Sequence, residues 1–282
     1  MYRGVVASLA TRHGKRVALG PPLRRHLGLR LRVPAVDTDA LGTFTGEVQR
    51  PGPARQVVVA KARLGMNAAG CRVGVASEGS FGPHPSAPWC GLQIEHVALV
   101  DDRLGLVVLE TATSVASKHA DLLTDGTDRG ELLAFARRTG LPGHALTVVP
   151  AVPVPGAPLA PAKGIVRLST LLAAVAAASE ASRDGRARVA ADLRAHHNPT
   201  RMAVIAEAGI RLARRMATRC PDCDAPGFGL VATRAGLPCS GCGRPTEQVA
   251  ERVRGCGLCA YERAERVQPD AADPGLCPHC NP

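Results

Sequence analysis

The chain has 282 residues and a formal net charge of +11, with room for one sizeable domain and one small one. Hydrophobic residues make up 45% of it but aromatic residues only 2%, so the core must consist largely of aliphatic side chains. The start of the chain carries no signal-peptide pattern, and the most apolar run, residues 171–179, is far shorter than a membrane-spanning helix of about 20 residues. These features argue against a membrane protein and lead us to expect a cytoplasmic one.

Apolar runs alternate with helical patterns along most of the chain. They predict strands at residues 5–10, 29–33, 72–76, 94–100, 104–111 and 144–149, of which the fourth and fifth form a hairpin. Helices are predicted at residues 21–27, 53–69, 128–139 and 168–182, and from Asn198 onward. The pattern indicates an α/β fold with a mixed sheet. We therefore predict a mixed-sheet domain at residues 1–165, a helical connector at 166–219 and tandem zinc ribbons at 220–282.

Three polar loops next to the predicted strands are candidate ligand sites, because loops at strand ends are where α/β domains gather ligands. The first, residues 11–16, combines backbone N–H groups at a helix entry with the Thr11 hydroxyl and the side chains of His13 and Lys15. That combination suits a phosphate group. The alternative is a solvated basic turn that binds no ligand.

The second loop, residues 37–47, holds three carboxylates and three threonine hydroxyls, with glycines that permit tight turns. Its candidate ligand residues are Asp37, Asp39, Thr45 and Glu47. Carboxylates that face a phosphate site commonly hold a magnesium ion, so this loop predicts one. The alternative is a loop in which the Asp and Thr side chains satisfy nearby backbone groups.

The third loop is predicted over residues 77–88 and has Glu78 directly after a strand, where it can act as a metal ligand or a general base. Small neighbours leave space around that carboxylate, and Ser77, Ser80 and His84 complete the candidate set. A fourth segment, residues 194–201, includes two adjacent histidines that point in different directions and form no ready metal pair. We expect this segment to contact the α/β domain at the start of a helix.

Eight cysteines in the last quarter of the chain form four C-x-x-C dyads, and two dyads supply the four thiolates of a closed structural zinc site. The dyads are Cys220/Cys223, Cys239/Cys242, Cys256/Cys259 and Cys277/Cys280. They are separated by 15, 13 and 17 residues, and only the first and last intervals fall in the usual zinc-ribbon range. The spacing therefore predicts two zinc ions with the dyads paired in series. An interleaved pairing and a disulfide framework are the alternatives.

Charge is distributed unevenly along the chain. Residues 220–282 contain six arginines and eight acidic residues, and two zinc ions with eight thiolates would bring this region near −6. Residues 1–219 carry +13 and would attract anions. The acidic ribbons argue against nucleic-acid binding, which usually uses a basic surface, and they suit a protein partner instead.

Nearly the whole chain resembles a bacterial domain-of-unknown-function family, number 6671. The resemblance rests on the paired ribbons and on the segments at residues 10–15, 37–39, 42–47, 76–85 and 198–201. The family is uncharacterised, so this resemblance implies no activity.

The first domain also resembles the inosine triphosphatase type of nucleoside triphosphate pyrophosphatase in the order of its motifs. The matching features are Thr11 with Lys15, then Glu47, Lys61 and Glu78. The resemblance implies that Thr11 and Lys15 hold phosphates. It also implies that Glu47 and Glu78 hold a magnesium ion, which activates water against the α-phosphate.

Two functions are consistent with these features. The first is a magnesium-dependent phosphohydrolase that acts on a nucleotide or another phosphorylated small molecule, with Lys15, Glu47 and Glu78 as catalytic residues and the ribbons as a structural tail. The second is a non-enzymatic zinc-ribbon adaptor or nucleic-acid-binding protein. Convergence of the three loops on one cavity would favour the first.

Overall fold

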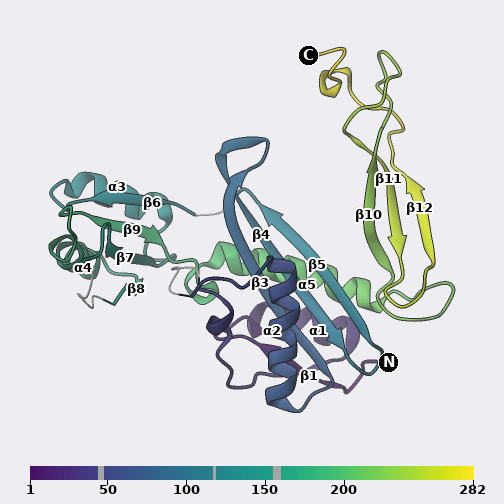
Figure 1. The fold of residues 1–282 in the computed structure, drawn as a ribbon, viewed down its shortest axis with the longest axis horizontal. Helices are drawn as coiled ribbons and strands as arrows, with labels where there is room; N and C mark the ends of the chain where they lie inside the picture. Colours follow the sequence, from purple (N-terminus) through teal and green to yellow (C-terminus); the bar gives the residue numbers. More distant parts are fainter. Residues whose placement is uncertain (44–47, 117–118, 155–159) are drawn as a thin grey trace.

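The computed structural model describes residues 1–43, 48–116, 119–154 and 160–282, and within these ranges the chain forms three sheets (Figure 1). The first sheet has the order β2-β1-β3-β4-β5. Its strands are β1 (Val6–Ala10), β2 (Arg30–Arg32), β3 (Val73–His84), β4 (Ala87–Asp101) and β5 (Leu106–Ser114). β1 pairs in parallel with β2 and β3, whereas β3, β4 and β5 form an antiparallel meander. This arrangement confirms the predicted α/β fold with a mixed sheet.

Helices cover both faces of the first sheet. Successive strand residues point to opposite faces, so two separate apolar clusters form. On one face, α1 (Arg16–Leu27) and α5 (Pro199–Ala217) pack against a cluster that includes Leu9. On the other face, α2 (Ala54–Ala69) packs against a cluster that includes the next residue, Ala10. The core is built almost entirely from aliphatic side chains, as the composition requires.

The described residues between 121 and 191 build a second, antiparallel sheet in the order β6-β9-β7-β8. Its strands are β6 (Asp121–Thr124), β7 (Leu146–Pro150), β8 (Ala162–Ile165) and β9 (Ala187–Ala191). α3 (Arg129–Thr139) and α4 (Leu168–Glu180) share its apolar core. The sequence pattern predicted β7 and both helices but not the other three strands, which are short and mix polar with small residues. Because β9 pairs with β7, this sheet spans the predicted domain boundary at residue 165.

α5 follows the second sheet and returns the chain to the first. Asn198 caps this helix as predicted: its side chain accepts a hydrogen bond from the Arg201 N–H at 2.9 Å, and Pro199 follows at the first helical position. The helix packs along α1, β4 and β5, so it is part of the first sheet's core rather than a separate connector. None of the described helices has both the length and the apolar character that a membrane span needs.

The third sheet comprises β10 (Gly229–Ala235), β11 (Val249–Gly255) and β12 (Glu262–Arg266), all antiparallel. It extends away from the first sheet beyond the end of α5 (Figure 1). The Arg215 guanidinium joins the two sheets, because it bonds both the Glu110 carboxylate of β5 and the carbonyl of Leu230 in β10.

Two elements differ from their predictions. β3 continues through residues 77–84, which were predicted as a loop, because its backbone pairs with β4 along that length. α1 begins at Arg16, so Pro21 and Pro22 lie inside the helix instead of opening it. Each proline removes one helix hydrogen bond, and the burial of this helix face against α5 offsets that loss.

Candidate functional site

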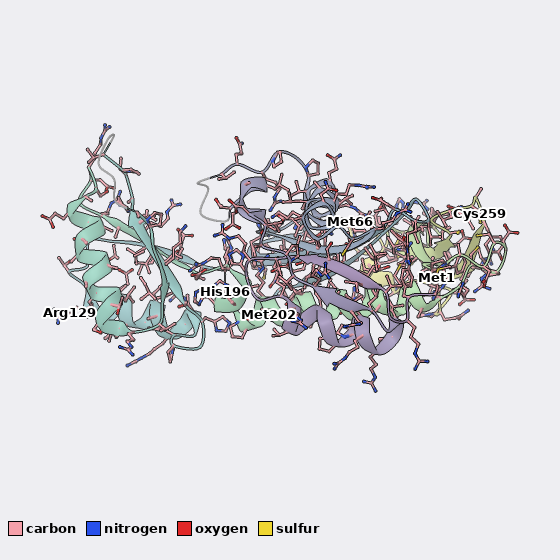
Figure 2. All side chains as sticks on the ribbon, turned by 90° about the horizontal axis from the view of Figure 1, so that it is seen from below. Met1, Met66, Arg129, His196, Met202 and Cys259 are labelled. Atoms are coloured by element: carbon pink, nitrogen blue, oxygen red, sulfur yellow. The ribbon has the colours of Figure 1, made fainter. Side chains whose placement is uncertain are left out.

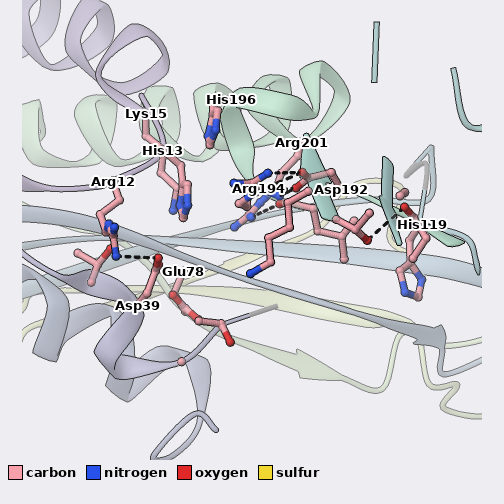
Figure 3. A pocket seen from close by; sticks show the side chains of 18 of the residues that line it. Arg12, His13, Lys15, Asp39, Glu78, His119, Asp192, Arg194, His196 and Arg201 are labelled. Atoms are coloured by element: carbon pink, nitrogen blue, oxygen red, sulfur yellow. Dashed lines mark hydrogen bonds and ion pairs between the residues drawn. The ribbon is translucent and has the colours of Figure 1, made fainter. Parts of the chain in front are cut away.

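A cavity of about 660 Å³ lies between the first sheet and the second (Figure 3). The first sheet contributes the loop after β1 and the middle of β3, and the second contributes residues of β6, β7 and β9. The 3-10 turn η2 (Ala195–His197) and the start of α5 line the cavity where the two parts meet, near His196 (Figure 2). The carboxyl ends of parallel strands such as β1 are the usual ligand sites of α/β folds.

All three polar segments singled out in the sequence contribute to this cavity. Its lining includes Thr11, His13 and Lys15 from the first, Asp39 from the second, and Ser77 and Glu78 from the third. The fourth segment lines it too, through Arg194, His196 and Arg201. The structure therefore brings together residues that are up to 190 positions apart in the chain.

Asp37 holds the second loop in shape and does not line the cavity. Its Oδ1 accepts hydrogen bonds from the Asp39 N–H at 3.0 Å and from Arg12 Nη1 at 2.8 Å. These bonds, with the backbone one as the larger cause, lower the pKa of Asp37. Asp37 thus satisfies a nearby backbone group, as the alternative interpretation of this loop expected. Asp39 lines the cavity and also pairs with Arg12, at 3.2 Å.

Two further candidates, Ser80 and His84, lie farther along β3 and outside the cavity lining. The Ser80 hydroxyl accepts a hydrogen bond from Arg50, and His84 Nδ1 accepts one from a backbone N–H of the β3–β4 turn. The structure therefore gives both residues local structural partners. Thr45 and Glu47 lie outside the described residues.

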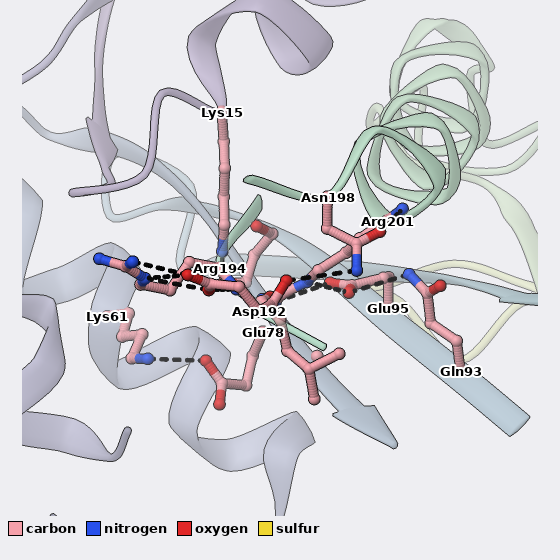
Figure 4. A network of polar contacts seen from close by, with 12 residues as sticks. Lys15, Lys61, Glu78, Gln93, Glu95, Asp192, Arg194, Asn198 and Arg201 are labelled. Carbon is pink, nitrogen blue, oxygen red and sulfur yellow. Dashed lines mark hydrogen bonds and ion pairs between the residues drawn. The ribbon is translucent and has the colours of Figure 1, made fainter. Parts of the chain in front are cut away.

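Glu78 is buried and paired with two cations. Its Oε2 lies 2.7 Å from Lys61 Nζ (Figure 4), and its Oε1 lies 3.1 Å from Arg50 Nη2. Both oxygens of this carboxylate are occupied, so a metal ion on it would have to displace one of the cations. The expected roles of Glu78 as metal ligand or general base therefore require this pair to rearrange.

A second buried ion pair joins β4 to α5. Arg201 Nε lies 2.6 Å from Glu95 Oε1, and the two side chains are 1% and 0% exposed. The guanidinium also donates to the Leu193 carbonyl and lies over the ring of Phe81, 5.7 Å from its centroid. This pair was not predicted from the sequence, although a glutamate inside the apolar run at residues 94–100 was an available signal.

Gly79 of β3 leaves the space that this ion pair occupies. A Cβ there would lie 2.5 Å from Glu95 Oε1 and 2.7 Å from Arg201 Nη2. Gly79→Ala is therefore expected to lower the free energy of unfolding by about 1–3 kcal/mol in urea denaturation. Gly82→Ala is the matched control on the same strand, because nothing lies within 4 Å of its Cβ position. Equal losses in the two variants would contradict this expectation.

Lys15 places a buried ammonium group at the cavity. The residue is 7% exposed, and its Nζ donates a hydrogen bond to the Ser77 carbonyl at 3.2 Å. No carboxylate in the described part of the chain lies within ion-pair distance of it. Burial, followed by the nearby charge of Arg201, lowers the pKa of Lys15 to about 8. The Ser77 hydroxyl is also buried, and it has no hydrogen-bond partner among the described residues.

Two neutral histidines stack beside this lysine. The rings of His13 and His196 have centroids 5.1 Å apart and planes inclined by 8°. Burial, followed by the charge of Lys15, lowers the pKa of His13 to about 3. Burial, followed by the charge of His197, also lowers the pKa of His196. Both imidazoles are therefore uncharged near neutral pH and able to accept a hydrogen bond.

Cationic side chains outnumber carboxylates among the described residues that line the cavity, by seven to four. The cations are Arg12, Lys15, Lys61, Lys163, Arg188, Arg194 and Arg201, and the carboxylates are Asp39, Glu78, Asp121 and Asp192. Burial raises the pKa of Asp192, but hydrogen bonds from Arg194 outweigh that effect and lower it. The cavity thus keeps an excess of positive charge, which suits an anionic ligand.

The eight dyad cysteines form two groups of four. The groups are Cys220, Cys223, Cys256 and Cys259, and Cys239, Cys242, Cys277 and Cys280. The nearest sulfurs lie 3.6–3.7 Å apart. A tetrahedron with metal–sulfur distances of about 2.3 Å has edges of about 3.8 Å, whereas a disulfide bond is about 2.05 Å long. The two groups could therefore each hold a metal ion.

The prediction that the dyads pair in series is wrong, because the first dyad meets the third and the second meets the fourth. Each interval between successive dyads contains one strand: β10, then β11, then β12. Every strand carries the chain from one end of the third sheet to the other. Alternate dyads therefore meet at the same end, which the interval lengths alone do not reveal.

A comparison with protein-family models matches residues 61–282 to the family described as Domain of unknown function (DUF6671). The chain belongs to this family. The part matched to DUF6671 contains Glu78, Glu95, Arg201 and all eight dyad cysteines, and it begins after the loop that carries Lys15. The comparisons with curated proteins and with solved structures gave no match. The chemistry of the cavity must therefore be argued from its own residues.

Proposed function

We propose that the protein binds a phosphorylated small molecule in this cavity and hydrolyses one of its phosphoanhydride or phosphoester bonds. The observation that carries the proposal is Lys15, a buried ammonium at the cavity whose described partner is a backbone carbonyl. A buried cation without an anion is costly, so an anion that binds beside it stabilises the arrangement. A phosphate group matches a lysine at a helix start particularly well.

The neighbours of Lys15 have complementary roles in this proposal. Thr11 shapes the turn, since its hydroxyl accepts a hydrogen bond from the His13 N–H at 3.2 Å. The neutral His13 ring lines the cavity and can accept a hydrogen bond that orients an attacking water. Magnesium would arrive with the ligand phosphates, because the described residues gather three metal-ligating side chains only in the cysteine groups.

Nucleoside triphosphates are the first ligands to test, because the motif order resembles that of inosine triphosphatase-type enzymes. Triphosphates, pyrophosphate and inorganic phosphate, each with magnesium, are expected to raise the melting temperature of the full chain. Lys15→Met is expected to weaken binding by roughly tenfold or more, because a buried charged hydrogen bond contributes about 1.5–3 kcal/mol. Arg16→Met is the matched control, since it removes an exposed cation next in sequence that does not line the cavity.

The outcomes separate binding from hydrolysis. A melting temperature that no phosphate compound changes, or equal losses of affinity in Lys15→Met and Arg16→Met, would contradict binding in this cavity. Binding without release of phosphate or pyrophosphate would contradict the hydrolase assignment while leaving the ligand class in place.

We also propose that the two cysteine groups hold structural zinc ions. Each group offers four thiolates, a ligand set and geometry typical of structural zinc. Four protein ligands leave no open position for a substrate, so these sites stabilise the third sheet and take no part in the proposed hydrolysis.

A further inference from the structure

Lys15 and Lys61 are equally buried, at 7% exposure, but their ammonium groups have different surroundings (Figure 4). Lys61 Nζ lies 2.7 Å from a Glu78 oxygen, so its charge is paired with a carboxylate. Lys15 Nζ has the Ser77 carbonyl at 3.2 Å as its hydrogen-bond partner. Burial without a paired carboxylate raises the fraction of Lys15 that is a neutral amine, and a neutral amine is a nucleophile.

The charged and titratable groups that face Lys15 come from every neighbouring element. They are Arg201 of α5, Glu95 of β4, Glu78 of β3, Lys61 of α2 and His13 of its own loop. Burial and the cations outweigh the carboxylates and lower the pKa of Lys15 to about 8. Near pH 7, roughly a tenth of the Lys15 side chains are then neutral, compared with well under 0.1% for an ordinary lysine.

Two groups beside Lys15 can form hydrogen bonds to the oxygen and nitrogen atoms between which an addition reaction moves protons. The Ser77 hydroxyl is buried, lines the cavity and has no partner among the described residues. The His13 ring also lines the cavity and is neutral. The excess of cations that line the cavity attracts the ligand's anionic group, which leaves the Lys15 amine for an uncharged electrophilic carbon.

We propose that Lys15 is the nucleophile of a covalent step in this cavity and forms a Schiff base with a phosphorylated aldehyde or ketone. The amine lone pair forms a bond to the carbonyl carbon, and the carbonyl π electrons move to the oxygen, which takes a proton. The nitrogen loses a proton to give a neutral carbinolamine. The hydroxyl group then takes a proton and leaves as water, and the nitrogen lone pair forms the C=N bond. This proposal rests on the proposed function in one respect only, which is that the cavity binds the phosphate group of the ligand.

Pyridoxal 5′-phosphate is a suitable probe, because it is an aldehyde that carries a phosphate. The full zinc-loaded chain would be incubated with it at pH 7, reduced with borohydride to convert the imine into a stable secondary amine, and mapped by mass spectrometry. We expect Lys15 to be labelled roughly tenfold or more faster than Lys61, because roughly a tenth of Lys15 is neutral at this pH whereas the Lys61 ammonium is held by the Glu78 carboxylate. The labelling rate should rise with a midpoint near pH 8, not near the 10.5 of an ordinary lysine. Inorganic phosphate should protect Lys15.

The outcomes distinguish this inference from the proposed function. Labelling of Lys61 as fast as Lys15, or no label on Lys15, overturns the Schiff-base step even if phosphate compounds raise the melting temperature. Pyridoxal lacks the phosphate group. If it labels Lys15 fast and inorganic phosphate gives no protection, the result supports the reactivity of the amine but overturns the proposal that the cavity binds the ligand's phosphate. Lys15→Arg keeps the charge and should abolish the label at this position. If that variant does not fold, the pH profile and the protection experiment on the unaltered chain decide the question.

Discussion

Glu95→Gln is expected to lower the free energy of unfolding by about 3–5 kcal/mol, because it leaves the Arg201 charge buried without its partner. The pair is almost completely shielded from solvent, with side chains 0% and 1% exposed, so water cannot replace the lost carboxylate. The pair also fixes the start of α5 on β4. The turn η2, which links the second sheet to α5, is thereby held against the cavity. Chemical denaturation of the intact chain, followed by circular dichroism, measures the loss.

Glu207→Gln is the matched control for this substitution. Glu207 pairs with Arg211 one turn along the same helix, but both of these side chains are 50% exposed. Solvent screens such a pair, so its loss should cost no more than about 1 kcal/mol. The double variant Glu95→Leu/Arg201→Met should recover most of the stability, because it removes both charges together. Equal losses of unfolding free energy for Glu95→Gln and Glu207→Gln would contradict the expectation that the buried pair stabilises the fold more than the exposed one.

Lys15 and Glu78 were singled out from the sequence because polar residues follow apolar runs there, and both line the cavity. Local pattern can indicate such positions, since the ends of neighbouring strands share one edge of a sheet. The partner of each charge could not be predicted in this way. Arg201 lies 106 residues from Glu95, and their contact depends on how the chain returns from the second sheet to the first.

Composition was misleading where strand pairing decides the structure. Ser77–His84 is rich in glycine, proline and serine, so it was predicted as a loop, yet it pairs with β4 as a strand. Gly79 is needed there because of the ion pair above it, a reason that only the tertiary structure contains. The zinc-ribbon spacing was misleading for a similar reason, since interval lengths do not show that a strand crosses the sheet between two dyads.

A protease site inserted after Glu247 is expected to yield two pieces that stay together in urea as long as zinc is bound. The cut falls between Cys242 and Cys256, so the first piece keeps two dyads and the second piece keeps the other two. With the interleaved groups of the structure, each metal takes two thiolates from each piece. Structural zinc contributes roughly 10–16 kcal/mol in small zinc modules, enough to hold the pieces through several molar urea.

Serial pairing predicts the opposite result for the same cut, because each piece would then keep a complete set of four thiolates and the pieces would separate in urea with zinc still bound. A cut after Gly236 is the control, since it leaves the pieces joined under either pairing. Metal analysis should give two zinc ions per chain, and a chelator should release the two pieces whichever of the two cuts is made. Separation of the Glu247 pieces before the chelator is added would contradict the interleaved arrangement. That arrangement arises because each strand of the third sheet carries the chain from one cysteine group to the other.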